Sequence, residues 1–244
     1  EAAKEATAKA INTACRDTGF FTLANHGLDA NIIERAFSEA AAFFDLPENE
    51  KAQISIENSP FHRGWYGHGG EVLDRARQPQ GDLKEGLKIG RDLPLDHPMV
   101  RAGTPLHGPN QWPKWGPNRG PNNAAFKSAM QAAFEACEAL SHQLMGAFAL
   151  SLGLAEDYFA PLLRLPMATL SPIRYPPPQD DRLGELGSNL GAGAHTDFGC
   201  LTLLLQRDEA GLEIELPNGD WVNVPCTPQH VTVNIGDMMA RWTN

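Results

Sequence analysis

A histidine and an aspartate separated by one residue are the side chains in this sequence whose types and spacing best suit metal chemistry. His195 and Asp197 lie within the segment 193–199, directly before the apolar run Leu201–Leu205. Side chains alternate between the two faces of a strand, so residues two positions apart share a face. A strand over 194–197 is therefore expected to present an imidazole nitrogen and a carboxylate oxygen side by side.

This pair supplies two of the three ligands of a common Fe(II) site. With a second histidine it forms the 2-His-1-carboxylate facial triad, which leaves coordination positions open for O₂ and substrate. A surface histidine beside a turn-capping aspartate is the alternative, because the bare spacing also arises by chance. The surroundings favour the metal interpretation. Small residues precede the pair and a predicted buried strand follows it, an arrangement typical of a pocket with a few polar groups.

The composition narrows the class of protein. The 244 residues include 20 Lys and Arg against 30 Asp and Glu, a net charge of −10 that argues against a nucleic-acid partner. No apolar run approaches the length of a membrane span, and no signal peptide is recognised, so no membrane partner is expected. The four cysteines are scattered without a C-x-x-C pair. This pattern predicts a reduced, cytoplasmic protein with free thiols, with disulfides as an alternative. The protein is also expected to be a monomer.

Helical periodicity dominates the first part of the chain and short strands dominate the last part. Helices are predicted over 1–16, over 30–46 with Asp29 as cap, and over 122–152 with Gly153 as its end. The predicted strands are 20–24, 63–67, 83–89, 168–175, 194–197, 200–206, 212–216, 221–224 and 230–235, with a hairpin turn at 217–220. Helices followed by closely spaced strands predict a helical layer on a sandwich or jelly roll.

Several separate motifs occur in an order that resembles a known family. They are the segment 14–21 running to Asn25-His26-Gly27, Arg63-Gly64, Asp82-Leu83-Lys84-Glu85, the segment 108–113, Arg174-Tyr175-Pro176-Pro177, the segment 193–205, Gly211-Leu212 and Asn234-Ile235-Gly236-Asp237. Together they resemble the isopenicillin N synthase-like family of Fe(II)/2-oxoglutarate-dependent oxygenases. The resemblance covers essentially the whole chain.

The resemblance implies a mostly β fold with flanking helices. Its core is a double-stranded β-helix, or jelly roll, backed by the long helix, and the C-terminal strands of that core are expected to be missing. The implied division is an N-terminal region of the oxygenase over 1–112, backing helices over 113–166 and a truncated jelly-roll core over 167–244.

The resemblance also implies roles for single residues. His195 and Asp197 match the first two iron ligands of the family, and Tyr175 matches a tyrosine that contacts a carboxylate of 2-oxoglutarate. The second histidine and an Arg-x-Ser that grips 2-oxoglutarate are expected after the segment that ends at Asn244. Strand alternation places Tyr175 on the inner face and Arg174 on the outer face, which argues against Arg174 as the co-substrate clamp.

Other candidates carry weaker signals. His26 is structural in the family, and His230 is interpreted as a surface residue. Phe198, Tyr66 and the loop 176–192 are candidates for the wall of a substrate pocket, with an ordinary packing role as an equal alternative for the two aromatic residues.

The implied activity is that of a 2-oxoglutarate-dependent dioxygenase. It oxidises a small organic metabolite by hydroxylation, desaturation or cyclisation and releases succinate and CO₂, with Fe(II), 2-oxoglutarate and O₂ as the cofactor and co-substrates. One alternative is an Fe(II) oxidase of the same fold that does not use 2-oxoglutarate. Another is a non-catalytic jelly-roll binding module. A zinc hydrolase is disfavoured, because three ligands of the usual His-rich type are not evident.

Overall fold

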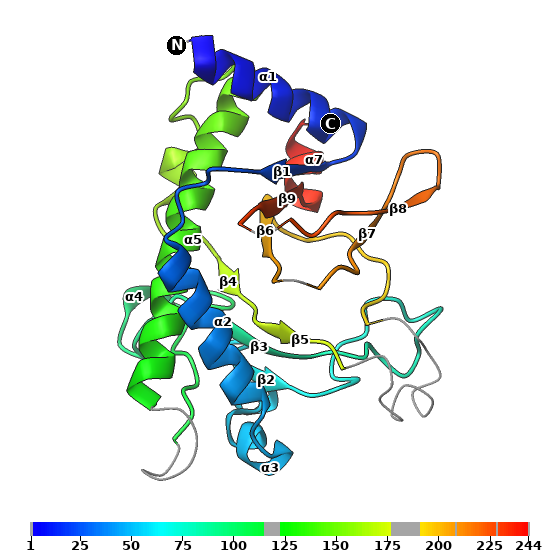
Figure 1. The fold of residues 1–244 in the computed structure, drawn as a ribbon. Helices are drawn as coiled ribbons and strands as arrows, with labels where there is room; N and C mark the ends of the chain where they lie inside the picture. Colours follow the sequence, from blue (N-terminus) through cyan, green and yellow to red (C-terminus); the bar gives the residue numbers. More distant parts are fainter. Residues whose placement is uncertain (1, 115–122, 177–190, 208, 228, 244) are drawn as a thin grey trace. The chain divides into compact units, whose positions relative to one another are not determined.

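The computed structural model describes residues 2–114, 123–176, 191–207, 209–227 and 229–243 (Figure 1). Its internal contacts group the chain into two compact units. Unit 1 comprises Glu1–Ala30, Ala136–Pro166 and Thr196–Asn244, and unit 2 comprises Asn31–Glu135 and Met167–His195. The sequence-based division at residues 112 and 166 stays a prediction.

Unit 1 is built around a small antiparallel sheet. Its elements are α1 (Ala2–Asp17), β1 (Phe20–Leu23), η3 (Ala160–Leu163), β6 (Leu201–Leu205), β7 (Glu213–Glu215), β8 (Trp221–Asn223), β9 (Val231–Ile235) and α7 (Asp237–Thr243). The strand order is β1-β9-β6, and β7 and β8 form a separate hairpin. Val231 and Val233 of β9 are fully buried and pack with Leu144 and Phe148 of the long helix, because alternate residues of the central strand face the same hydrophobic core.

Unit 2 contains a second antiparallel sheet. Its elements are α2 (Ala30–Phe44), α3 (Glu48–Lys51), η1 (Ala52–Ile54), η2 (Ile56–Asn58), β2 (Gly64–Tyr66), β3 (Glu85–Gly90), α4 (Pro98–Arg101), β4 (Thr169–Leu170) and β5 (Ile173–Arg174). The strand order is β2-β3-β4, and β5 also pairs with β3. Leu87 and Ile89 of β3 pack with Phe43, Phe126 and Met130 in its core.

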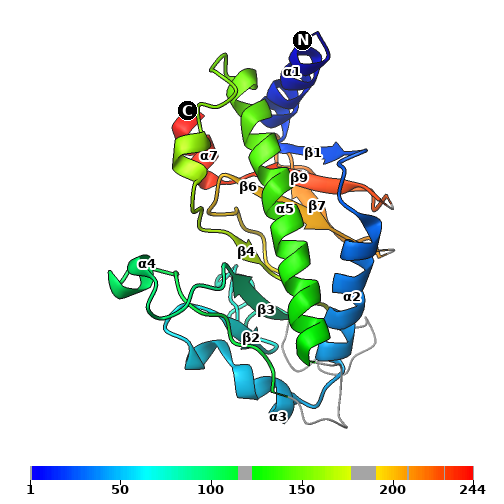
Figure 2. The same ribbon diagram turned by 90° about the vertical axis from the view of Figure 1, so that its left-hand side faces the viewer.

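The long helix α5 (Asn123–Ser151) contributes to the core of both units (Figure 2). Apolar residues at helical spacing are buried along its whole length, from Phe126 and Met130 to Leu144 and Phe148. The helix ends just before Gly153, whose φ of +74° is the left-handed conformation that commonly terminates a helix. The predicted helix, its buried stripe and its terminating glycine are therefore confirmed.

Two predicted strands differ from the structure. The strand expected over 168–175 is divided into β4 and β5 by Ser171-Pro172, because proline has no N–H to continue the ladder. The segment 194–197 is not a strand but an irregular stretch of chain. The carbonyls at its C-terminal end accept hydrogen bonds from a turn instead: the N–H of Asp237 donates to Asp197 O at 2.7 Å, and that of Gly236 donates to Cys200 O at 3.1 Å.

The described residues combine antiparallel sheets with helices, and more of them lie in helices than in strands. None of the described helices is long and apolar enough to cross a membrane. All four cysteines are free thiols, as the sequence predicts.

Candidate functional site

The imidazole of His195 is oriented by the backbone of its own segment. Its Nδ1 lies 2.8 Å from the carbonyl oxygen of Gly193. A carbonyl can only accept a hydrogen bond, so Nδ1 carries the proton and Nε2 is the nitrogen that a metal would use. Metal-binding histidines typically donate their other ring N–H to a carbonyl or carboxylate in this way. The local geometry of His195 therefore fits a metal ligand.

The carboxylate of Asp197 is held by two side chains from the sheet of unit 1. Its Oδ2 accepts a hydrogen bond from Thr202 Oγ1 at 2.6 Å and another from Asn234 Nδ2 at 2.7 Å. Thr202 and Asn234 lie directly opposite each other on β6 and β9. Both bonds fall on Oδ2 and fix the plane of the carboxylate. Hydrogen bonding of this kind is typical of carboxylate ligands.

A turn after β9 fixes the backbone around Asp197. The hydroxyl of Thr196 donates to Asp237 Oδ2 at 3.2 Å, in addition to the backbone bond from Asp237 to Asp197. A side chain at Gly236 would place its Cβ 2.7 Å from the carbonyl oxygen of Asp197, closer than such atoms approach in proteins. Glycine is therefore required where this turn meets the segment that carries Asp197.

His195 and Asp197 fall on either side of the boundary between the two units, which lies between His195 and Thr196. Within the described parts of the chain, no three His, Cys, Asp or Glu side chains are grouped closely enough to hold a metal ion. An imidazole nitrogen and a carboxylate oxygen are each a donor type that suits Fe(II).

Tyr175 follows β5 and contacts the segment that leads to His195. A Cβ at Gly191 would meet the Tyr175 ring at 2.5 Å, so ring and glycine are closely packed. The side chain of Tyr175 is 52% exposed and that of Ile173 is 37% exposed. The inner-face position expected for both stays a prediction. Burial around the hydroxyl raises the pKa of Tyr175; Lys84 lowers it, while Asp82 and Glu71 raise it further.

Buried charges lie beside Tyr175. Lys84 is almost fully buried, with its Nζ 2.8 Å from Glu71 Oε2 and 3.0 Å from Asp82 Oδ2. Burial alone would lower the pKa of Lys84, but the two carboxylates outweigh it and raise this pKa. Burial alone would raise the pKa of Glu71, but Lys84 and Lys88 outweigh it and lower this pKa. The group is therefore a set of mutually stabilised charges.

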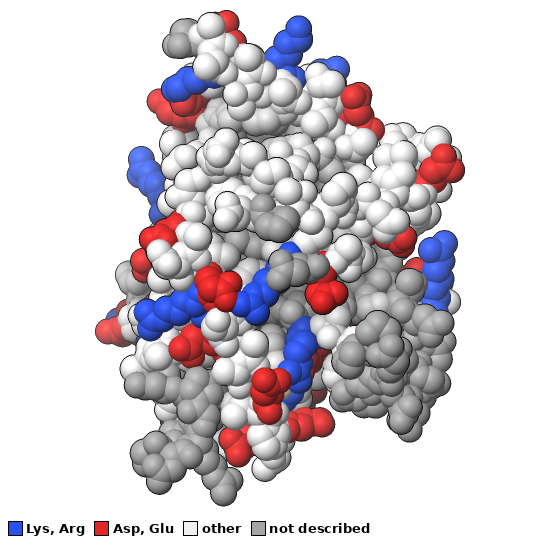
Figure 3. All heavy atoms as spheres, in the orientation of Figure 1, with Lys and Arg blue, Asp and Glu red and all other residues white. Residues whose placement is uncertain are grey.

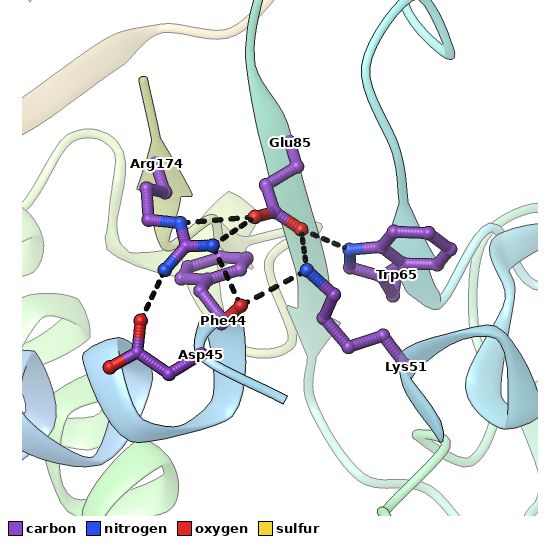
Figure 4. Close-up of polar contacts among 6 residues, drawn as sticks. All are labelled: Phe44, Asp45, Lys51, Trp65, Glu85 and Arg174. Atoms are coloured by element: carbon purple, nitrogen blue, oxygen red, sulfur yellow. Dashed lines mark hydrogen bonds and ion pairs between the residues drawn. The ribbon is translucent and has the colours of Figure 1, made fainter. Parts of the chain in front are cut away.

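Arg174 is engaged by a separate network (Figure 4). Its guanidinium donates to Glu85 Oε1 at 3.0 Å, to Asp45 Oδ1 at 2.6 Å and to the carbonyl of Phe44 at 2.8 Å. Glu85 is 1% exposed and also accepts from Lys51 Nζ at 2.6 Å and from the Trp65 indole at 2.8 Å. Arg174 thus ties β5 to the end of α2 and to β3.

The sequence and the fold both match known proteins. Residues 1–115 match the N-terminal family of non-haem dioxygenases described for morphine synthesis, and residues 164–244 match the 2OG-Fe(II) oxygenase superfamily. A 2-oxoglutarate-Fe(II) type oxidoreductase, hxnY, of Emericella nidulans is 34% identical over 244 residues, which cover 100% of this chain and 68% of that protein. The chain belongs to the 2-oxoglutarate–Fe(II) oxygenase superfamily.

Other relatives carry the same activity. A 2-oxoglutarate-dependent dioxygenase, citB, of Monascus ruber is 34% identical over 235 residues, covering 96% of this oxygenase and 69% of that protein. The crystal structure of full-length Neurospora crassa T7H in complex with alpha-KG and thymine matches with a TM-score of 0.81 and 31% identity, covering 99% of this chain and 71% of that one. The protein is thus a 2-oxoglutarate-dependent dioxygenase that uses Fe(II) and O₂ to oxidise a small organic molecule. This result favours the first interpretation of the sequence over the 2-oxoglutarate-independent oxidase and the non-catalytic module.

The remaining candidate residues of the oxygenase have varied surroundings. His26 has both ring nitrogens engaged, one by the N–H of Leu28 at 3.1 Å and the other with the carbonyl of Gln229 at 3.0 Å, which agrees with a structural role. His230 is half-buried, and its expected surface position stays a prediction. Phe198 is 87% exposed, whereas Tyr66 is buried in β2. Most of the candidate loop, residues 177–190, lies outside the described residues.

The sequence predicted no role for three polar residues that hold the segments of His195 and Asp197: Thr202, Asn234 and Asp82. Thr202 and Asn234 interrupt the apolar runs of β6 and β9, and a polar residue inside a predicted buried strand is a signal that could have identified both. Asp82 carried no such signal, because its neighbours in the sequence are themselves mixed in polarity.

The charged surface of the oxygenase is mixed in sign. On the face drawn in Figure 3, Lys and Arg side chains alternate with Asp and Glu, and the described residues show no continuous basic area there.

Proposed function

We propose that His195 and Asp197 are two of the Fe(II) ligands and that Tyr175 donates a hydrogen bond to a carboxylate of 2-oxoglutarate. One observation carries the metal assignment: each of the two side chains is held in the manner of a metal ligand. Nδ1 of His195 bonds to a carbonyl, and Oδ2 of Asp197 accepts two hydrogen bonds shorter than 2.8 Å. No other His-x-Asp pair occurs in the 244 residues.

When bound, Fe(II) and 2-oxoglutarate supply an oxidant from O₂, with release of succinate and CO₂. The residues of this chain would hold the metal and the co-substrate and orient the groups that bind them. Thr202 and Asn234 would keep the Asp197 carboxylate in one orientation when it binds the metal. The phenol of Tyr175 is protonated at neutral pH, as tyrosine ordinarily is, and can donate a hydrogen bond to a carboxylate.

The described strands from residue 167 onward are proposed to be part of a jelly-roll core. The TM-score of 0.81 to an oxygenase solved with its co-substrate supports this architecture. In a jelly roll two antiparallel sheets face each other, and the described strands of this chain pair antiparallel in every sheet.

The substrate is proposed to be a small organic metabolite, with no nucleic acid or membrane partner, and the protein to act as a cytoplasmic monomer. Thymine is the natural first member of a substrate panel, because the Neurospora crassa relative is solved with thymine bound. Small heterocycles related to it complete the panel.

Succinate release tests the assignment of Tyr175. The Tyr175→Phe variant removes only the hydroxyl, and loss of a hydrogen bond to a charged group costs about 1.5–3 kcal/mol. The apparent Michaelis constant for 2-oxoglutarate should therefore rise by roughly tenfold or more, with a smaller change in that for the prime substrate.

Tyr158→Phe is the matched control, because Tyr158 is 54% exposed and packs edge-on against Phe159 in unit 1. It should leave both constants unchanged. If Tyr175→Phe behaves like Tyr158→Phe, Tyr175 does not contact 2-oxoglutarate.

A further inference from the structure

A wholly buried carboxylate lies next to the segment that leads to His195. Asp82 has no exposed surface, and its charge is balanced by Lys84, whose Nζ lies 3.0 Å from Asp82 Oδ2. The backbone of Asp82 is fixed as well. Its carbonyl accepts from Gly69 N at 2.9 Å, and its N–H donates to Glu71 O at 2.8 Å. Asp82 is therefore a rigid, charged acceptor inside unit 2.

The carboxylate of Asp82 accepts a hydrogen bond from the backbone of Gly193. The N–H of Gly193 donates to Asp82 Oδ1 at 3.1 Å, and the carbonyl of the same residue accepts from His195 Nδ1 at 2.8 Å. Asp82, Gly193 and His195 thus form a chain of two hydrogen bonds that ends on the imidazole.

Close packing at Gly193 is a second, independent sign that this segment is held in place. A Cβ at position 193 would lie 2.7 Å from Asp74 Cβ, 2.8 Å from Asp74 N and 2.9 Å from Gln78 Oε1. Gln78 is 1% exposed, so its side chain has little room to move away. Position 193 therefore packs closely against Asp74 and Gln78, and only glycine fits at that position.

We propose that Asp82 is a positioning residue for the metal site, acting through Gly193 to set the orientation of the His195 ring. The inference rests on the proposed role of His195 as a ligand. The physical reason is that Gly191, Ala192 and Gly193 restrict the backbone little on their own. The bond to Asp82 adds to the restriction that packing at Gly193 imposes, and the carbonyl of Gly193 then holds the Nδ1–H tautomer of His195.

Anaerobic titration of metal-free protein with Fe(II) in a calorimeter tests the proposal. Loss of a partner that orients a metal ligand typically weakens metal binding 10–100-fold. Asp82→Ala, which removes the acceptor, should weaken Fe(II) binding by about tenfold. Asp82→Asn keeps an oxygen at Oδ1 and should stay within about threefold of the unmodified protein, although it loses the charge that faces Lys84.

Glu85→Gln is the matched control, because it removes an equally buried carboxylate that pairs with Lys51 in the same unit and has no bond to the 191–195 segment. It should leave Fe(II) affinity unchanged.

A readout without metal is the tautomer of His195, measured by ¹⁵N NMR. The Nδ1–H form should predominate in the unmodified protein and in Asp82→Asn, and lose its predominance in Asp82→Ala. Should Asp82→Ala not fold, Asp82→Ser, which is too short to reach Gly193, takes its place with the same expectations.

Each outcome separates the possibilities. Unchanged affinity and tautomer in Asp82→Ala would overturn the positioning role. An equal loss in Asp82→Asn and Asp82→Ala would also overturn it, because the charge rather than the hydrogen bond would then matter. A loss in Glu85→Gln as large as that in Asp82→Ala would assign the effect to general loosening of unit 2. His195→Ala serves as the reference. If it binds Fe(II) normally, the proposed function fails at His195, whatever Asp82 does.

Discussion

Glu85 is expected to be the most sensitive charged residue for the stability of unit 2. The perturbation is Glu85→Gln, which keeps the shape of the side chain and removes its charge. Glu85 is 1% exposed and is contacted by Lys51 at 2.6 Å, by the Trp65 indole at 2.8 Å and by Arg174 at 3.0 Å. The side-chain amide of the Glu85→Gln variant would turn its N–H group toward at least one of these donors, so at least one hydrogen bond is lost. The buried ammonium group of Lys51 is then left without its counter-charge.

The size of the effect follows from the burial of Lys51. Its side chain is 8% exposed, whereas that of Arg174 is 41% exposed and can be solvated by water. Removing one partner of a buried pair costs about 3–5 kcal/mol. The amide oxygen can still accept from Arg174, so we expect a loss near the lower end, about 3 kcal/mol in the free energy of unfolding.

Urea unfolding followed by circular dichroism measures this loss. Glu213→Gln is the control, because Glu213 is an exposed residue of β7, and it should change the free energy of unfolding by less than about 0.5 kcal/mol. The double variant Lys51→Met/Glu85→Gln should lose less free energy of unfolding than the two single variants added together, by at least about 1 kcal/mol. The reason is that the double variant removes both charges of the pair and leaves neither buried alone. A loss below about 1 kcal/mol for Glu85→Gln alone would refute this reasoning.

Three further predictions concern the metal ligand, acid stability and thiol reactivity. Thr202→Val removes the 2.6 Å bond to Asp197 and should weaken Fe(II) binding about tenfold in anaerobic calorimetry; unchanged affinity would show that this bond does not orient the ligand. Burial alone would raise the pKa of Asp92, but bonds from Asn110, Trp112 and Lys127 outweigh it and lower this pKa. The charged Asp92 therefore stabilises the folded protein at neutral pH, and this stabilisation is lost as the pH falls through the lowered pKa of Asp92. Urea unfolding should thus show that Asp92→Asn reduces the free energy of unfolding more at about pH 7 than at about pH 3. Burial raises the pKa of Cys15 and Cys137 to about 11. Iodoacetamide at about pH 8 should therefore label both thiols at least tenfold more slowly in the folded protein than in the unfolded protein. Equal labelling rates would contradict the burial of these thiols.

Elements with strong periodicity could be predicted from the sequence. The buried stripe of α5, from Phe126 to Phe148, and the alternating valines of β9 repeat at the spacing of their element, and the structure has both. The turn at 217–220 was also predictable, because Asn218-Gly219 favours a tight hairpin and Gly219 has a φ of +86°.

The local conformation of the 191–199 segment could not be predicted in the same way. Strand alternation was assumed for His195 and Asp197, but the backbone there is fixed by partners far away in the sequence, Asp82 for Gly193 and the 236–237 turn for Asp197. Such contacts depend on tertiary structure, and a glycine-rich segment carries no periodicity that reveals them. The identity of the candidate ligands came from residue types and motif order, while their orientation came only from the structure.

Anaerobic calorimetric titration with Fe(II) tests the central claim most directly. The measurement compares the unmodified protein with His195→Ala, Asp197→Ala and the control His230→Ala, each first shown to be folded by circular dichroism. We predict that His195→Ala and Asp197→Ala each lose at least tenfold in Fe(II) affinity, whereas His230→Ala binds as the unmodified protein does. Unchanged Fe(II) affinity in both His195→Ala and Asp197→Ala would contradict the assignment of these two residues as the metal ligands.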